Sequence, residues 1–410
     1  MHPIHDPAGA GALPLSVSCA SFRNLGALAL ASSLAFHGIA HAQAPSPPRF
    51  HVSTSSTVTI GSTVFDDSAL VSAGGGGSPF SFFVEGHWQA TAGFVPGDID
   101  AFARRPNMVA GSAGSMVFST LSNDGGFLDG DILGLAPGGG IEVVLPEALL
   151  AAGLGTPTAN IDVDALAYDD QGSILFSLLD DLPGTLYGTV LDGDVLVREA
   201  LGIVAIVMTE ADVQARFTLA TGSASAIGDV SGLEFSAGEV WVTVLSPSAF
   251  DGAVISCGAL PGVVADEAAM GLGGAELDAI ALADPDDEVP AFTLLPAAAL
   301  PGDTLSVEIH GQPNSIVVAL MAGNTGWLNF GSRPGFGAWY LDPLDPWLLT
   351  ILGMSATYAK LDSQGLFRAT WPLPTGNVYG TGFGGELGWS FQIVEAPSLE
   401  LSAPYRVTKL

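Results

Sequence analysis

The residues of this sequence best suited to chemistry are aspartates that recur in two short patterns. In the first pattern one apolar residue separates two aspartates, and in the second pattern a glycine separates them. The eight residues are Asp98, Asp100, Asp162, Asp164, Asp129, Asp131, Asp192 and Asp194. Ca²⁺ prefers oxygen ligands, and two adjacent carboxylates repel unless a cation or a backbone N–H lies between them. These eight aspartates are therefore candidate calcium ligands.

The same aspartates have a second interpretation, in which they accept hydrogen bonds from the backbone amides of turns. In the first pattern, the alternation of side chains along a strand would place Asp98 and Asp100 on one face, where they could share a cation. The sequence contains neither the EF-hand pattern nor the calcium-binding nonapeptide repeat. Calcium binding and turn capping therefore both stay open from the sequence.

Motifs of established enzyme classes are absent from the sequence. The histidines after residue 42, His51, His87 and His310, are dispersed and have no metal-ligand spacing. There is no Gly-x-Ser-x-Gly nucleophile motif, and the glycine run at 74–77 has no following lysine. A carboxylate pair for glycoside hydrolysis has no specificity as a signal among 42 acidic residues. The sequence favours a non-enzymatic protein, with no catalytic residue predicted.

The first aspartate pattern opens a degenerate internal repeat. Residues 98–103 (DIDAFA) return as 162–167 (DVDALA), and more weakly as 229–234 (DVSGLE) and 276–281 (ELDAIA). A Phe-Ser pair, an Asp-Gly turn and an apolar run follow the first two copies. Each unit thus offers about four short strands at a period of roughly 50 to 65 residues, which is typical of a propeller blade.

The two ends of the repeat region complement each other. Residues 50–53 and 66–71 resemble the middle of a unit without its opening strand, and the copy at 276–281 is an opening strand without a clear middle. We expect strands from both ends to complete one blade. The prediction is an all-β, propeller-like repeat domain of four or five blades over residues 43–290, with a β-sandwich or an irregular β-solenoid as the alternative.

One helix is predicted within this region. Residues 209–219 (TEADVQARFTL) begin with Thr209 as the N-cap, and the acidic Glu210 and Asp212 lie in the first turn. The interpretation is an insertion between the second and third full units.

A second domain is predicted after a Pro- and Ala-rich linker at 291–301. Residues 302–410 contain seven strand-like runs, of which residues 305–309 (LSVEI) alternate as a strand with one solvated face should. This number of short strands predicts a small immunoglobulin-like β-sandwich.

The N-terminus has the features of an export signal. An apolar run at 25–36 precedes the small-x-small sequence at 40–42, and it is shorter than the ~20 residues that span a bilayer. A signal peptide is therefore predicted over residues 1–42, with no membrane span after cleavage and a secreted, periplasmic or outer-surface location. Cys257 is then the single cysteine, and its apolar surroundings predict a buried, inert thiol.

The composition limits the partners. The net charge is -31, with 42 acidic and 11 basic residues, so nucleic acid and anionic membranes are poor partners. Hydrophobic residues make up 48% and charged residues 13%, which excludes a disordered acidic tail. The 53 glycines and 27 prolines favour many turns and an all-β fold.

The layout resembles a loose group of uncharacterised secreted repeat proteins of Gram-negative environmental bacteria of the planctomycete type. The resemblance rests on the Asp-x-Asp-Ala and Phe-Ser elements, on Asp-Gly-Asp before a strand, and on residues 392–394 (QIV) followed by 401–402 (LS). It covers most of residues 50–410. It implies export, an all-β build and a C-terminal small β-sandwich, and it supplies no activity.

These observations give two function hypotheses from different classes. The first is a secreted, acidic, non-enzymatic binding or surface-associated protein whose ligand is an extracellular molecule or cell-surface polymer. The alternative is a Ca²⁺-dependent hydrolase or lyase that acts on an extracellular polymer. Asp98, Asp162 and Asp229 around one channel would favour the alternative if a cation lay between them, whereas local bonds to turn amides would favour the first hypothesis.

Overall fold

We describe the chain from a computed structural model. The structure describes residues 48–410 apart from short gaps, which are 61–62, 107–114, 124, 137–138, 200–201, 246–249, 284–289, 330–337, 343, 346–347, 349–357, 377, 383 and 397–399. The predicted signal peptide lies outside these residues. A compact unit covers Ser46–Leu410.

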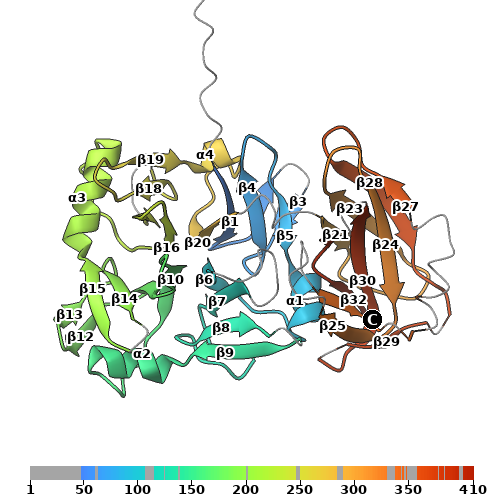
Figure 1. Ribbon diagram of the computed structural model, residues 1–410, viewed down its shortest axis with the longest axis horizontal. Helices are drawn as coiled ribbons and strands as arrows, with labels where there is room; N and C mark the ends of the chain where they lie inside the picture. Colours follow the sequence, from blue (N-terminus) through green and yellow to red (C-terminus); the bar gives the residue numbers. More distant parts are fainter. Residues whose placement is uncertain are drawn as a thin grey trace, which may run out of the picture. The chain divides into compact units, whose positions relative to one another are not determined.

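The protein is mostly β and consists of many small antiparallel sheets (Figure 1), which confirms the all-β prediction. Among the described residues, no sheet closes on itself. Four sheets have four strands each. The second sheet is formed by β6 (Ile99–Arg104), β7 (Met116–Thr120), β8 (Ile132–Leu135) and β9 (Ile141–Leu145). The third is formed by β10 (Val163–Tyr168), β11 (Ile174–Leu178), β14 (Val195–Arg198) and β15 (Val204–Met208). The fourth is formed by β16 (Gly232–Ser236), β17 (Glu239–Thr243), β18 (Val254–Ser256) and β19 (Gly262–Ala265).

The first sheet joins strands from the two ends of this region. Its order is β20 (Leu277–Leu282), β1 (Arg49–Thr54), β4 (Leu70–Gly74) and β5 (Phe80–Phe83). Strand β1 pairs antiparallel with β20, and Val52 lies opposite Ile280. The expectation that both ends complete one unit is therefore confirmed.

The opening strands of the four sheets pack on one another. Figure 1 shows β6, β10, β16 and β20 side by side at the centre of the four sheets, and each contacts the next in a ring that β20 and β6 complete. A separate apolar cluster fills each of the four interfaces between neighbouring sheets. Because each sheet buries both faces against two neighbours, the opening strands are almost wholly buried.

A helix follows the last strand of every sheet. The four are α1 (Glu85–Thr91), α2 (Glu147–Leu154), α3 (Glu210–Thr221) and α4 (Glu267–Met270). The predicted N-cap is confirmed, because the Thr209 side chain accepts a hydrogen bond from the Asp212 amide. The interpretation of this helix as an insertion is wrong. It belongs to the repeating unit, and the other three helices escaped notice because they are shorter and less polar.

Two-stranded hairpins extend this region. They are β2 (Val58–Ile60) with β3 (Thr63–Phe65), and β12 (Leu182–Thr185) with β13 (Gly188–Val190). Within the described part of the chain, no helix is both long enough and apolar enough to cross a membrane.

The C-terminal region forms two main sheets that share one apolar core. The smaller sheet contains β21 (Ala291–Leu295), β23 (Thr304–His310) and β28 (Leu366–Pro372). The larger sheet contains β22 (Ala298–Ala299), β32 (Tyr405–Lys409), β30 (Leu387–Ala396), β24 (Ile316–Ala322) and β27 (Tyr358–Lys360), with β29 (Gly380–Thr381) and β31 (Glu400–Leu401) at its side. A further hairpin joins β25 (Thr325–Asn329) to β26 (Ala338–Leu341).

The segment 291–301, which we expected to be a linker, belongs to these sheets. Strand β21 pairs with β23, and β22 pairs in parallel with β32. The Tyr405 hydroxyl also donates a hydrogen bond of 2.6 Å to the Leu294 carbonyl oxygen. The proline and alanine content misled the prediction, because β21 and β22 are short strands on either side of Pro296. In β23 the predicted alternation is confirmed.

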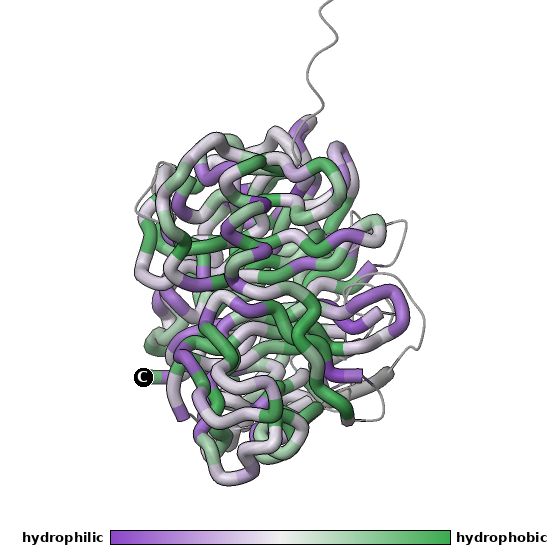
Figure 2. The backbone as a smooth tube through the Cα atoms, turned by 90° about the vertical axis from the view of Figure 1, so that its left-hand side faces the viewer, coloured by the Kyte–Doolittle hydropathy of each residue, from purple (hydrophilic) through white to green (hydrophobic). Residues whose placement is uncertain are grey.

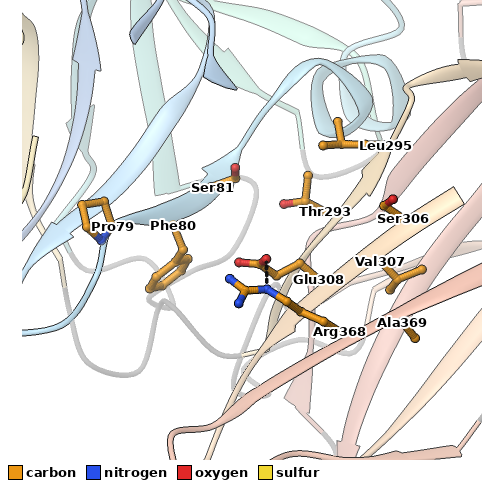
Figure 3. Close-up of a pocket in the computed structure, with 10 residues that line it drawn as sticks. All are labelled: Pro79, Phe80, Ser81, Thr293, Leu295, Ser306, Val307, Glu308, Arg368 and Ala369. Atoms are coloured by element: carbon orange, nitrogen blue, oxygen red, sulfur yellow. Dashed lines mark hydrogen bonds and ion pairs between the residues drawn. The ribbon is translucent and has the colours of Figure 1, made fainter. Parts of the chain in front are cut away.

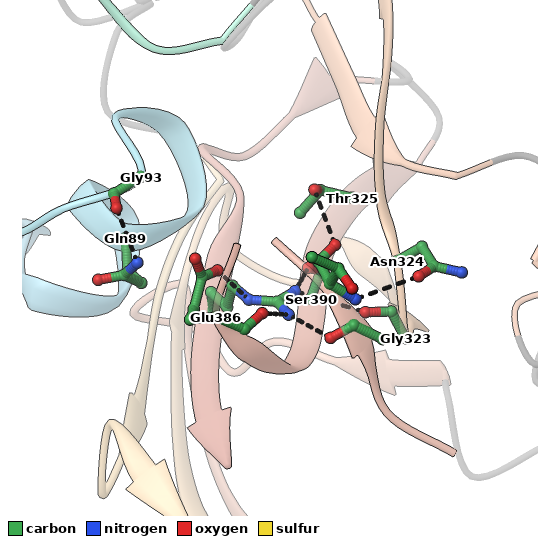
Figure 4. A network of polar contacts seen from close by, with 10 residues as sticks. Gln89, Gly93, Gly323, Asn324, Thr325, Glu386 and Ser390 are labelled. Atoms are coloured by element: carbon green, nitrogen blue, oxygen red, sulfur yellow. Dashed lines mark hydrogen bonds and ion pairs between the residues drawn. The ribbon is translucent and has the colours of Figure 1, made fainter. Parts of the chain in front are cut away.

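A buried arginine ties the larger C-terminal sheet together (Figure 4). The Arg406 side chain is 0% exposed, pairs with the Glu386 carboxylate, and donates to the Ser390 hydroxyl at 2.6 Å. It also donates to the Gly380 carbonyl oxygen at 2.7 Å. Loss of one partner would leave a buried charge, so this network holds the sheet in one arrangement.

Short hydrophobic and hydrophilic segments alternate along the backbone (Figure 2), as a chain of short strands and turns requires. Cys257 is buried, and burial raises the pKa of its thiol to about 12, which confirms the prediction of an inert cysteine.

Candidate functional site

The second aspartate of the first pattern lies at a β-bulge in three of the four opening strands. In β6, Ile99 lies opposite Thr120 and Ala101 lies opposite Ser119, so Asp100 is the extra residue. Asp164 in β10 and Asp278 in β20 occupy the same position. A bulge residue is unpaired and can point away from both faces of the sheet, which is why bulges often re-aim side chains beside functional sites.

The burial pattern supports these bulges. Ile99 and Phe102, three residues apart, belong to one apolar cluster, whereas Ala101 and Ala103 belong to the next. Strict alternation would separate Ile99 from Phe102. The sequence argument that alternation places Asp98 and Asp100 on one face is therefore wrong, because Asp98 precedes the strand and Asp100 interrupts the alternation.

The bulged aspartates converge with Asp229, the residue that opens the third copy of the repeat. Burial and the nearby Asp162, Asp278, Asp98 and Asp229 carboxylates together raise the pKa of Asp100 to about 9, with burial the largest cause. Burial likewise raises the pKa of Asp164 well above its ordinary value, with Asp229 the largest of its acidic neighbours. Carboxyl groups from all four sheets thus share one region. We call Asp100, Asp164, Asp229 and Asp278 the carboxylate cluster.

The raised pKa values favour protonated carboxyl groups in the cluster near neutral pH. Burial raises the pKa of Asp278 to about 8 and that of Asp229 to about 7. The neighbouring Asp164 side chain acts against burial and lowers the pKa of Asp229. Asp229 also accepts the Val230 amide at 2.7 Å, so it is the more readily ionised member of the pair.

Several buried carboxylate oxygens in this region lack a hydrogen-bond donor. Asp100 is 4% exposed and Asp164 is 5% exposed, and among the described residues no N–H or O–H group donates to Oδ2 of either. The same holds for Oδ1 of Asp98 and of Asp162. The unsatisfied atoms are thus equivalent in two repeats. A buried ionised oxygen without a donor is costly, so these positions call for a proton or a cationic ligand.

Further carboxylates lie beside the cluster. Asp98 and Asp162 are half-buried, like the cluster member Asp278. Burial raises the pKa of Asp98 to about 6 and that of Asp162 to about 7. The acidic neighbours with the largest effects on Asp98, Asp162 and Asp229 come from turns of the preceding repeats; these are Asp67, Asp129 and Asp192, respectively. The turns therefore add to the negative charge near the cluster.

In each Asp-Gly-Asp turn, the first aspartate lies near the cluster and the second has a structural role. Asp131 accepts the Leu128 amide at 3.1 Å and the amide of Glu147, the first residue of α2, at 2.9 Å. Asp194 makes the equivalent two bonds and holds the first amide of α3 at 2.7 Å. Asp131 and Asp194 therefore cap turns and helix starts, as the capping interpretation predicted.

The helices α2 and α3 also explain the glycine between these aspartates, because a side chain at that position would collide with the first residue of the helix. A Cβ at Gly193 would lie 2.4 Å from Cγ of Glu210 at the start of α3. A Cβ at Gly130 would lie 2.6 Å from Cγ of Glu147 at the start of α2. The glycine thus lets each helix approach the turn closely.

The Phe-Ser element has a role that the sequence analysis missed. The Ser119 hydroxyl donates to the Val163 carbonyl oxygen at 2.7 Å, and the Ser177 hydroxyl donates to the Val230 carbonyl oxygen at 2.8 Å. Ser53 makes the equivalent bond to Ile99 at 2.8 Å. Each serine therefore joins its sheet to the opening strand of the next sheet, beside the aspartate that enters the cluster.

The structure thus brings together Asp98, Asp100, Asp162 and Asp164 among the eight predicted ligands, and it places Asp129 and Asp192 around them. The candidate ligand set omitted Asp229 and Asp278, although both occur in the weaker repeat copies. An alignment of the four repeat copies, position by position, would have included both residues. Among the described residues, no group of three or more His, Cys, Asp or Glu side chains is arranged to hold a metal ion.

A pocket of about 360 Å³ lies between β5 and the strands β21, β23 and β28 (Figure 3). Its main charged groups already have partners within the chain. Glu308 accepts a hydrogen bond from Arg368 at 2.6 Å and pairs with His310 at 2.8 Å. The bond to His310 and the Arg368 guanidinium lower the pKa of Glu308 to about 2, and Phe80 stacks on His310 with ring centroids 4.4 Å apart. The carboxylate cluster, with its unsatisfied oxygens, is the stronger candidate site.

No protein-family model matches this chain, and no curated protein is significantly similar to it. Among solved structures, it is similar to YCF48 bound to a D1 peptide, at 8% identity and a TM-score of 0.22 over 48% of this chain and 50% of that chain. It is also similar to the extracellular domain of a putative one-component system from B. thetaiotaomicron, at 9% identity and a TM-score of 0.23 over 85% of this chain and 41% of that chain. The chain therefore spans half or less of the length of these two structures. Similarities of this size carry no argument about activity.

Proposed function

We propose that this protein is an exported, acidic binding protein whose carboxylate cluster captures a cationic group. The observation that carries the proposal is the convergence of Asp100, Asp164 and Asp278 from three bulges, where Asp100 and Asp164 each have a buried oxygen with no donor among the described residues. Proteins bury unpaired carboxylates rarely, and strongly raised pKa values in one cluster are typical of functional sites.

The proposal includes a specific architecture. The four sheets with packed opening strands are the blades of a four-bladed β-propeller, whose centre contains the cluster. The order β22-β32-β30-β24-β27 opposite β21-β23-β28 is that of a small immunoglobulin-like sandwich. The propeller supplies the cation site, and the sandwich is a second domain attached to it.

Export follows from the predicted signal peptide at 1–42. An extracellular location gives the acidic site access to cell-surface or dissolved cations. N-terminal sequencing of the secreted protein should give a start at or near Gln43, and a start at Met1 would contradict export.

The cation-binding function can be tested by titrating the protein with inorganic and organic cations. Isothermal calorimetry at constant ionic strength measures the binding. At least one cation should bind, and Asp100→Asn and Asp164→Asn should each weaken that binding at least tenfold. Asp170→Asn is the matched control, because Asp170 is an exposed aspartate outside the cluster. Absence of binding by every cation, or equal binding by all four proteins, would contradict the proposal.

One observation favours a second function. Asp164 and Asp229 are buried neighbours, and burial raises the pKa of Asp229 to about 7 and that of Asp164 well above its ordinary value, which suits groups that exchange protons in general acid–base catalysis. A hydrolase or lyase acting on an extracellular polymer would use Asp229 as the base, because it is the more readily ionised. Release of reducing or unsaturated ends from a polymer panel, lost in Asp229→Asn, would support this function. If no polymer releases such ends, the hydrolase or lyase function is contradicted and only the binding function stands.

A further inference from the structure

The atoms that lack partners in the carboxylate cluster indicate which kind of cation fits it. Oδ2 of Asp100 and Oδ2 of Asp164 belong to side chains that are 4% and 5% exposed, and the charged groups that shift the pKa values of these two residues most are other aspartates of the region. Oδ1 of Asp98 and Oδ1 of Asp162, two residues earlier in the same two repeats, also lack a donor. When the carboxyl groups are ionised, all four oxygens need hydrogen-bond donors, and they belong to equivalent segments of two neighbouring repeats.

The described bases of this chain do not meet that need. The two lysines, Lys360 in β27 and Lys409 in β32, belong to the C-terminal sheets. The charged groups that shift the pKa values of Asp100 and Asp164 most are carboxyl groups, with no lysine or arginine among them. Among the described residues, no base of the chain therefore neutralises these two aspartates, and an external cation would supply the missing charge.

A directly bound metal ion fits this arrangement poorly. Ca²⁺ requires several oxygens at 2.3–2.6 Å from one point. Within the described ranges, no three acidic, histidine or cysteine side chains are grouped in that way. A cation with N–H groups has a looser requirement, because its charge-assisted hydrogen bonds span ~2.7–2.9 Å and point in several directions.

Organic nitrogen cations supply the missing donors as well as the charge. An ammonium group has three N–H donors and a guanidinium group has five, in a planar fork that reaches carboxylates on both sides. Asp98, Asp162 and Asp278 are half-buried, whereas Asp100 and Asp164 are buried, so the region holds carboxyl groups at more than one depth.

We propose, on the basis of the cation-binding function above, that the ligand of the cluster carries a primary ammonium or guanidinium group. This group donates N–H hydrogen bonds to the four unsatisfied oxygens, and its charge replaces protons held by the cluster. The raised pKa of Asp100 supports this linkage, because a bound cation lowers the pKa of adjacent carboxyl groups.

The test compares four probes at equal ionic strength and pH 8 by thermal unfolding of the whole protein. The probes are ethylammonium, arginine ethyl ester, tetramethylammonium and Ca²⁺. Tetramethylammonium is the matched probe, because it has the same charge and no N–H donor. We expect ethylammonium or arginine ethyl ester, near saturation, to raise Tm by about 2–4 °C. Tetramethylammonium should leave Tm unchanged.

Each alternative result has a distinct meaning. Stabilisation by Ca²⁺ without stabilisation by the two N–H probes would overturn this inference and leave the cation-binding function intact. An equal effect of tetramethylammonium would also overturn it, because charge alone would then suffice. No effect of any probe would overturn both the inference and the cation-binding function.

Variants test whether the Tm shift comes from binding at the carboxylate cluster. The Asp100→Asn and Asp164→Asn double variant should lose the Tm shift, whereas Asp170→Asn should keep it. Calorimetry in buffers of different ionisation enthalpy gives a second readout, since binding at pH 7 should release protons only if the cluster is the site. Spermidine and a blocked lysine tripeptide then distinguish a free amine from a protein side chain as the source of the group.

Discussion

Replacement of Asp100 by asparagine should make the protein more stable at neutral and alkaline pH. Burial and the surrounding carboxylates raise the pKa of Asp100 to about 9 in the folded protein, whereas an aspartate in the unfolded chain has a pKa of ~3.9. Between these values the unfolded chain releases a proton that the folded protein retains. The free energy of unfolding therefore falls as the pH rises from about 4 towards 9.

The size of this effect follows from the pH interval. At pH 7 the penalty is at most ~4 kcal/mol, because ~3 pH units contribute ~1.4 kcal/mol each. Protons are shared among coupled carboxyl groups, so the loss at a single site is smaller. We expect the free energy of unfolding of Asp100→Asn to exceed that of the wild type by about 2 kcal/mol at pH 7. At pH 4 the two proteins should be equally stable, because residue 100 is neutral in both folded proteins.

Urea denaturation at pH 4, 5.5, 7 and 8 measures this difference. Comparison of variant and wild type is essential because burial lowers the pKa of His87 to about 3. The unfolded chain then binds a proton below pH ~6.5 that the folded protein excludes, so both proteins lose stability towards acid by the same amount. Asp170→Asn should follow the wild type at every pH. An Asp100→Asn protein with the wild-type pH slope would refute the argument that the cluster is buried and protonated.

Three further predictions concern the framework, and urea denaturation checks all of them. Ser119→Ala removes a hydrogen bond between two sheets and should cost about 1 kcal/mol, whereas Ser122→Ala, at an exposed position, should have no effect. Gly193→Ala forces a Cβ against the start of a helix and should cost about 1–3 kcal/mol, whereas Gly262→Ala meets no atom within 4 Å and should be far milder. Arg406→Met leaves a buried carboxylate unpaired and should cost about 3–5 kcal/mol. Wild-type stability of Arg406→Met would contradict the role of its buried network, and wild-type stability of Gly193→Ala would contradict the close approach of the helix. Equal stability of Ser119→Ala and Ser122→Ala would contradict the hydrogen bond between the two sheets.

Much of the fold could be predicted because local patterns repeat. The Asp-x-Asp-Ala element marks the opening strand in two of the four sheets, and its variant Glu-x-Asp-Ala marks that of a third. The partial units at the two ends predicted the pairing of β1 with β20. The helix at Glu210–Thr221 was predicted over residues 209–219 from its N-cap Thr209 and from the acidic residues of its first turn. The three other helices and the strands at 291–301 were missed, because short apolar segments have no period that separates helix, strand and linker.

The candidate site could be predicted only in part. The residue type and spacing singled out Asp98, Asp100, Asp162 and Asp164, and these do lie in one region. The same criteria selected Asp131 and Asp194, which cap turns. Spacing cannot separate these roles, because an aspartate two residues from another serves equally well as a cap or as a ligand.

The sequence by itself determined that the chain is acidic, mostly β and built from a degenerate repeat, because composition and local periodicity are written along the chain. Only the tertiary structure decided which aspartates matter together. Asp100, Asp164 and Asp278 are far apart in the sequence, and they meet because a bulge turns each one out of its strand and because the four opening strands pack in a ring. Burial then converts their shared charge into raised pKa values and unsatisfied oxygens, which no local pattern reveals.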